Sequence, residues 1–136
     1  MKLQRYLPLL LPLALISCTQ TESSPWRHAR HYLYQSDDGF NPNFYTNKAD
    51  STRMMAPFFA QFYDMGVKDR AAGKPEKEAR QQASQFRDVK YLKSIQGTTN
   101  FAGKTYTDSD ALSPDALRAL GNAISGTYMD GYAGIK

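Results

Sequence analysis

Apolar residues recur at three- and four-residue steps within residues 50–72, which is the spacing of an amphipathic helix. The stripe consists of Met55, Phe58, Phe59, Phe62, Met65 and Gly66. Pro57 leaves two possibilities open: the helix begins near Ala56 with the proline in its first turn, or it begins at Ser51 and bends at the proline. The Gly-Lys-Pro sequence at 73–75 predicts the end of this helix.

A second helix is predicted over residues 113–132. The sequence Ser-Pro-Asp at its start offers a capping hydroxyl, a proline for the first turn and an acid for the positive end of the helix dipole. One face carries Leu117, Leu120, Ile124 and Tyr128, and small residues occupy much of the rest. Each internal glycine destabilises a helix by roughly 0.5–1 kcal/mol, so close approach of another helix should offset that loss. We therefore expect Gly66 to meet the 123–131 stretch closely.

The sequence of residues 75–96 predicts a third helix, which is more polar than the other two. Its thin apolar stripe consists of Ala79, Ala83, Phe86 and Leu92, and Asp88 could interrupt it and cap a second short helix. The segments 36–49 and 96–110 are rich in turn-forming residues and predict loops. The sequence thus predicts a small all-α domain, a bundle of about three helices that follows an N-terminal loop region.

The first 17 residues have the pattern of a bacterial secretory signal, in which basic residues precede a short apolar run. That run contains two prolines and is too short to span a bilayer, which needs about 20 apolar residues. It ends in Leu15-Ile16-Ser17-Cys18, which resembles the lipobox of bacterial lipoproteins. The resemblance implies cleavage between Ser17 and Cys18, two acyl chains on the Cys18 sulfur and a third on the new amine. Several acyl chains together make a stable membrane anchor.

The chain is therefore divided into a lipoprotein signal peptide at 1–17, a lipidated tether at 18–25 and a single helical domain at 26–136. Cys18 is the only cysteine, so no intramolecular disulfide can form and stability must come from packing. The leader holds two of the 17 basic residues and none of the 13 acidic ones, which leaves a balance of +2. These charges are scattered and mixed, so no direct binding of nucleic acid is expected.

The basic, aromatic segment 26–34 contains both histidines of the chain, His28 and His31. On a helix they would share a face, as metal ligands can, but two ligands do not complete a metal site. Two other interpretations stay open: an exposed membrane-proximal segment, or contact of its Arg, Trp and Tyr residues with anionic lipid head groups. The Asp- and Asn-rich sequence at 37–43 lacks the acid spacing and the distal glutamate of a calcium loop. No metal and no cofactor are therefore predicted.

The common catalytic motifs are missing from the sequence. It contains no Gly-x-Ser-x-Gly, no His-Glu-x-x-His and no glycine-rich phosphate loop. Asp64 and Asp130 could be imagined as a carboxylate pair for sugar hydrolysis, but capping, pairing with Lys68 or solvation explains them more simply. Cys18, the only thiol, is assigned to lipid. We therefore predict that the protein is not an enzyme and has no catalytic residues.

Four segments have distinctive sequences, at residues 27–31, 36–44, 52–70 and 127–132. They resemble the plasmid entry-exclusion lipoproteins of enterobacteria, and the resemblance runs over most of residues 15–133. It implies a lipoprotein anchored in the outer membrane that limits uptake of related plasmids by the host cell. By the same resemblance, a threonine rather than an aspartate directly after Cys18 favours the outer membrane.

The resemblance also implies two kinds of partner. One is the membrane, bound through the lipid anchor, and the other is a protein component of the transfer apparatus or the envelope. An alternative stays open, in which the chain is a non-enzymatic envelope lipoprotein that supports assembly of another membrane complex.

Overall fold

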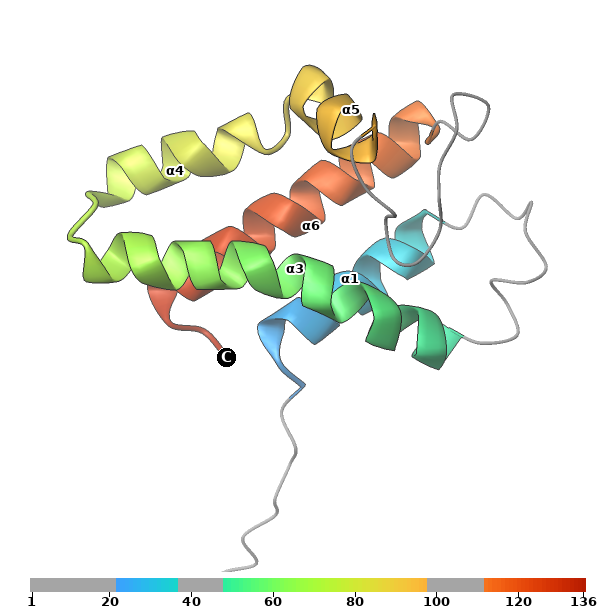
Figure 1. Ribbon diagram of the computed structural model, residues 1–136, viewed down its shortest axis with the longest axis horizontal. Helices are drawn as coiled ribbons and strands as arrows, with labels where there is room; N and C mark the ends of the chain where they lie inside the picture. The colour runs from blue at the N-terminus through green and yellow to red at the C-terminus, as the bar shows by residue number, and fades with distance from the viewer. Residues whose placement is uncertain (1–21, 37–47, 98–111) are drawn as a thin grey trace, which may run out of the picture.

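The part of the chain that the structure describes is folded into helices. A computed structural model describes residues 22–36, 48–97 and 112–136. Its helices are α1 (Ser24–Gln35), α3 (Lys48–Ala71), α4 (Glu76–Gln85), α5 (Val89–Gly97) and α6 (Pro114–Ala133) (Figure 1). The predicted all-α class is confirmed, but these three ranges hold five helices rather than about three.

The two additional helices have local causes in the sequence. α1 occupies much of the expected N-terminal loop region and begins inside the segment expected to be tether, where Pro25 suits a first turn. Three residues at helical spacing give it a buried face: Ala29, Tyr32 and Leu33. The predicted polar helix is divided at Asp88, whose Oδ1 accepts hydrogen bonds from the backbone N–H groups of Lys90 at 2.9 Å and Tyr91 at 3.1 Å. Asp88 thus caps α5, as the sequence suggested.

α6 is the central helix of the bundle. The side chain of Ser113 accepts a hydrogen bond from the N–H of Ala116 at 3.2 Å, which confirms the predicted cap, and Gly134 ends the helix in the left-handed region. The predicted apolar face is buried along its whole length, at Leu117, Leu120, Ile124 and Tyr128. α1, α3, α4 and α5 all pack against α6. The core therefore forms around this helix.

α3 contains Pro57 inside its length. Because the helix begins at Lys48, the possibility that it starts near Ala56 is wrong. Gly73 follows the helix with a φ of 76°, which confirms the predicted stop. Most of the predicted stripe packs inward, at Met55, Phe58, Phe59, Phe62 and Gly66. Met65 differs from the prediction because it is 39% exposed and belongs to the surface.

Glycines let α3 and α6 approach each other closely. A Cβ added at Gly66 would overlap the backbone oxygen of Tyr128, and one added at Gly131 would overlap the backbone oxygen of Tyr63. The obstacles are backbone atoms of the facing helix, which cannot move without moving the helix itself. The predicted contact between Gly66 and the 123–131 stretch is therefore confirmed.

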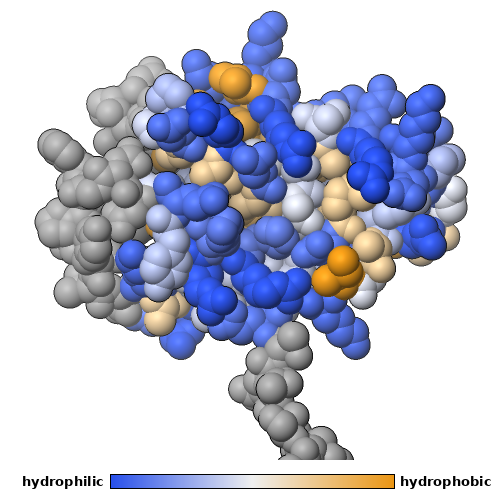
Figure 2. All heavy atoms as spheres, turned by 180° about the vertical axis from the view of Figure 1, so that it is seen from behind, coloured by the Kyte–Doolittle hydropathy of each residue, from blue (hydrophilic) through white to orange (hydrophobic). Residues whose placement is uncertain are grey.

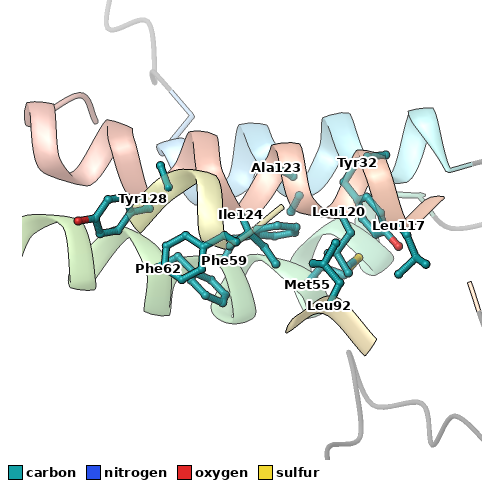
Figure 3. Close-up of a cluster of buried hydrophobic side chains, with 14 of the residues drawn as sticks. Tyr32, Met55, Phe59, Phe62, Leu92, Leu117, Leu120, Ala123, Ile124 and Tyr128 are labelled. Carbon is teal, nitrogen blue, oxygen red and sulfur yellow. The ribbon is translucent and has the colours of Figure 1, made fainter. Parts of the chain in front are cut away.

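Aromatic rings join the helices in the core. Tyr32 on α1 lies edge-on to Phe59 on α3, with ring centroids 6.2 Å apart. Phe86 follows α4. The centroid of its ring lies 5.3 Å from that of Phe62 and 5.4 Å from that of Tyr128. Edge-to-face contacts of this kind are a preferred geometry for aromatic pairs. Figure 3 shows the side chains of α3 and α6 converging on this core.

The directions of the helices determine which ends lie together. α3 and α6 run the same way, since Met55 lies near Leu120 early in both helices and Asp69 bonds Tyr128 late in both (Figure 3). α1 runs the opposite way, because its start is hydrogen-bonded to the end of α6. α1 lies on one side of α6 and α5 on the other (Figures 1 and 3).

Candidate functional site

The predicted lipid attachment and cleavage positions, Cys18 and Ser17, lie outside the described residues, as does the sequence at 37–43. The described part begins at Glu22, and the first residue of α1, Ser24, is buried. The structure therefore shows where the chain that follows the predicted anchor joins the folded domain.

A polar cluster fastens the start of α1 to the end of α6. Oγ of Ser24 donates to Oδ2 of Asp130 at 2.7 Å, and Nε2 of His28 lies 2.9 Å from the same oxygen. Nη2 of Arg27 adds an ion pair to that oxygen at 3.5 Å. We call these four residues the Asp130 cluster. Gly126 makes room for it, because a Cβ there would lie 2.6 Å from the imidazole of His28.

A serine, a histidine and an aspartate meet in the Asp130 cluster, but not in the order that hydrolysis requires. In a catalytic triad the histidine lies between the other two, so that it can take the proton from the serine. Here Asp130 lies between Ser24 and His28 and bonds both through one oxygen. Ser24 is also 0% exposed, so its hydroxyl is out of reach of a substrate. The arrangement is suited to holding α1 in place.

Little in the local sequence indicates the Asp130 cluster, because Ser24 and Asp130 are 106 positions apart. The imagined pairing of Asp130 with Asp64 differs from what the structure shows: Asp64 is exposed on α3, whereas Asp130 is bonded to α1. The helical spacing of Ala29, Tyr32 and Leu33 is one feature of the sequence from which α1 could have been predicted. A helix with that spacing also places Ser24 and His28 one turn apart on the same side.

Arg27 extends the junction to the segments that flank it. Its Nη1 donates to the backbone oxygen of Glu22 at 2.7 Å and to that of Lys136 at 2.6 Å. Arg30, one turn further along α1, donates to Oε1 of Glu22 at 2.6 Å. The residues before α1 and after α6 are therefore held together at one end of the bundle.

A second polar network ties the end of α3 to α6. The hydroxyl of Tyr128 donates to Oδ2 of Asp69 at 2.5 Å, and Nζ of Lys74 donates to the same oxygen at 2.6 Å. The hydroxyl of Tyr132 donates to the backbone oxygen of Lys74 at 2.6 Å. The hydrogen bonds from Lys74 and Tyr128 hold the pKa of Asp69 below its ordinary value. Burial, and then the bond to Asp69, raises the pKa of Tyr128, so its hydroxyl keeps the proton.

We expect this network to make the free energy of unfolding depend on pH in the acid range. Because the pKa of Asp69 is lower in the folded chain, the unfolded chain binds more protons between the two pKa values. The contribution is fully present above the unfolded pKa of about 3.9 and is lost as the pH falls through the folded value. Thermal unfolding followed by circular dichroism should show Tm falling more steeply with acid in the wild type than in Asp69→Asn. Parallel declines would contradict this role of Asp69.

The described ranges hold no group of three or more His, Cys, Asp or Glu side chains that could bind a metal ion. His28 is bonded to Asp130, whereas His31 is exposed on α1. Among the helices described here, none is both long and apolar enough to cross a membrane.

Two outward faces are candidate interaction surfaces. The outward face of α1 carries Trp26, Arg27, Arg30, His31 and Tyr34. The outward face of α5 carries Val89, Lys90 and Lys93. Figure 2 shows a surface that is mostly hydrophilic, with small and separate hydrophobic spots. A partner that approaches this side of the domain would therefore meet mainly hydrophilic side chains.

Comparisons of the chain with models of protein families, with curated proteins and with solved structures found no match.

Proposed function

We propose that this chain is a lipoprotein of the outer membrane that limits uptake of related plasmids by its host cell. Cys18 carries the lipid, and the helical domain acts by contact with a component of the transfer apparatus or the envelope. The resemblance of the segments at 27–31, 36–44, 52–70 and 127–132 to exclusion lipoproteins supports the proposal.

The anchoring part of this proposal is supported by the short stretch of chain between Cys18 and the first buried residue, Ser24. Ser24 is 0% exposed and follows Cys18 by six positions. Six extended residues span at most about 20 Å. A lipid on Cys18 would therefore keep the domain at the bilayer, where an incoming transfer apparatus must pass.

Residues of the segment 127–132 hold the helices of the domain together. Such a rigid domain is suited to a protein that acts by contact. Tyr128 and Tyr132 bond the end of α3 and the turn after it, Asp130 bonds α1, and Gly131 meets the backbone of α3. Each of these contacts fixes one helix against another. A rigid domain presents its surface to a partner without an entropy penalty for ordering it.

We assign the outward face of α5 to the protein partner. Val89 is 52% exposed, and no carboxylate of the described residues forms an ion pair with Lys90 or Lys93. Some other exposed arginines do pair with an acid one turn away, as in Arg80–Glu76 at 2.6 Å. A positively charged face with an exposed valine fits an acidic protein surface. α5 and α1 lie on opposite sides of α6 (Figure 1).

Conjugative transfer into recipient cells that express the chain tests the proposal. The transfer frequency of a related plasmid should fall relative to recipients without the chain, whereas an unrelated plasmid should enter normally. Cys18→Ser should restore entry of the related plasmid, because the domain is no longer held at the membrane. Immunoblots of membrane fractions show whether each protein accumulates.

An unchanged transfer frequency, with the wild-type protein present in the outer membrane, would contradict the exclusion role. Crosslinking followed by pull-down then examines the assembly role. Recovery of a stable envelope partner from plasmid-free cells would favour that alternative.

A further inference from the structure

We propose that the outward face of α1 lies on the membrane surface and binds anionic lipid head groups. Arg30 and His31 are exposed on this face, Tyr34 is 58% exposed, and Trp26 is half-buried. The opposite face packs into the core through Ala29, Tyr32 and Leu33. The core therefore fixes which side of α1 points outward. The membrane contact rests on the lipid anchor proposed at Cys18.

The length of chain between the anchor and α1 brings this face within reach of the bilayer. The six residue steps from Cys18 to Ser24 span at most about 20 Å. α1 has 12 residues and is therefore about 18 Å long. With the lipid inserted, the whole outward face of the helix can lie along the head groups. α5 has no such link to the anchor, because it lies on the other side of α6 (Figure 1).

The residues of the face have the chemistry of a membrane interface. Arginine binds phosphate groups through two parallel N–H donors, and Trp and Tyr rings concentrate at the depth of the head groups. Lys48 adds a cation on this side, with Nζ 4.2 Å from the ring centroid of Tyr34. Exposed residues of α5 include lysines and a valine but no tryptophan, so α1 is better suited to lipid.

Among the described residues, two carboxylates lie at this face and weaken its attraction for anionic lipid. Arg30 pairs with Glu22 at 2.6 Å, and Arg27 pairs with Asp130 at 3.5 Å. The net positive charge is therefore small, and the face would bind lipid weakly by itself. A weak contact is sufficient here, because the acyl chains keep the helix at a high effective concentration next to the bilayer.

Trp26 is the only tryptophan of the chain and lies on α1, so its fluorescence reports on this face alone. The purified lipidated protein would be reconstituted in vesicles of phosphatidylcholine, with or without phosphatidylglycerol. Lipids spin-labelled near the head group should quench Trp26 in the phosphatidylglycerol vesicles, and acrylamide should quench it less there than in phosphatidylcholine vesicles. High salt should weaken the lipid quenching, since it screens the arginines.

A pair of charge reversals provides the matched comparison. Arg30→Glu should reduce quenching by the spin-labelled lipid, whereas Arg118→Glu should not, because Arg118 is a surface arginine that also pairs with one acid but lies on α6. Equal quenching in both vesicle types, or in Arg30→Glu and the wild type, would overturn the binding of anionic head groups by α1.

Failure of the anchor is distinguishable from failure of the α1 contact. Mass spectrometry shows whether Cys18 carries acyl chains, and flotation shows whether the protein stays with the vesicles. A protein that floats with acyl chains but has unquenched Trp26 overturns the α1 contact and leaves the anchor intact. A protein without acyl chains overturns both the anchor and the contact that rests on it.

Discussion

Replacing Gly66 by leucine is expected to destabilise the domain by about 3 kcal/mol, the upper end of the usual range for overpacking. Even the first added atom, Cβ, would overlap the backbone oxygen of Tyr128 and lie 2.6 Å from the backbone nitrogen of Tyr132. Both atoms belong to α6, which the other helices hold in place. At about 5 °C per kcal/mol for a domain of this size, Tm should fall by roughly 15 °C. Thermal unfolding followed by circular dichroism measures this change.

Val67→Leu is the matched control for Gly66→Leu. Val67 is the next residue of α3 and is 42% exposed, so a leucine there adds a methylene to a side chain that already reaches solvent. Its stability should stay within about 0.5 kcal/mol of the wild type. If Gly66→Leu does not fold, Gly66→Ala adds Cβ alone and should give a smaller loss. A wild-type Tm in both Gly66 variants would show that α3 and α6 are not in close contact.

Tyr128→Ala is expected to destabilise the domain by about 4 kcal/mol, as truncation of a buried aromatic residue typically does. Tyr128 is 0% exposed, its ring lies edge-on to Phe86 at 5.4 Å, and its hydroxyl bonds Asp69. Alanine would leave a cavity at the point where α3, α6 and Phe86 meet. Urea unfolding followed by circular dichroism gives the free energy of unfolding.

Tyr128→Phe separates the ring of Tyr128 from its hydroxyl. The variant keeps the contact with Phe86 and loses only the hydrogen bond to Asp69, which Lys74 continues to bind. The expected loss is about 1 kcal/mol. Equal losses in the alanine and phenylalanine variants would mean that the hydrogen bond, rather than packing, accounts for the contribution of Tyr128.

The sequence predicted the elements whose signals are local. α6 was predictable because a capping serine, a proline and an acid precede its apolar face at helical spacing. Gly66 was predictable as a contact because glycines inside two helices need a compensating close approach. α1 was not predicted because charged and aromatic residues surround its short apolar stripe. Pro57 was ambiguous because a proline suits a first turn and yet occurs inside α3, where surrounding contacts hold the helix.

The candidate site was less predictable because its contacts join distant parts of the chain. The sequence suggests metal binding as a role to test for His28, and a carboxylate pair with Asp64 for Asp130. In the structure, His28 and Asp130 bond each other across 102 positions. The sequence pattern shows the spacing of residues along one helix, but it does not show which polar side chains of two different helices will form a hydrogen bond. Cys18 follows from the lipobox sequence alone, and the described residues begin after it.

For the lipid anchor proposed at Cys18, the Asp130 cluster would have a mechanical consequence. α1 runs opposite to α6, so a pull on the tether reaches Ser24, His28 and Arg27 before it reaches the apolar contacts further along α1. Because these three residues contact Asp130, they would transmit the force to α6, the most deeply buried helix. A force applied through the proposed anchor would therefore act on α1 and α6 together, and would not separate α1 from the bundle first.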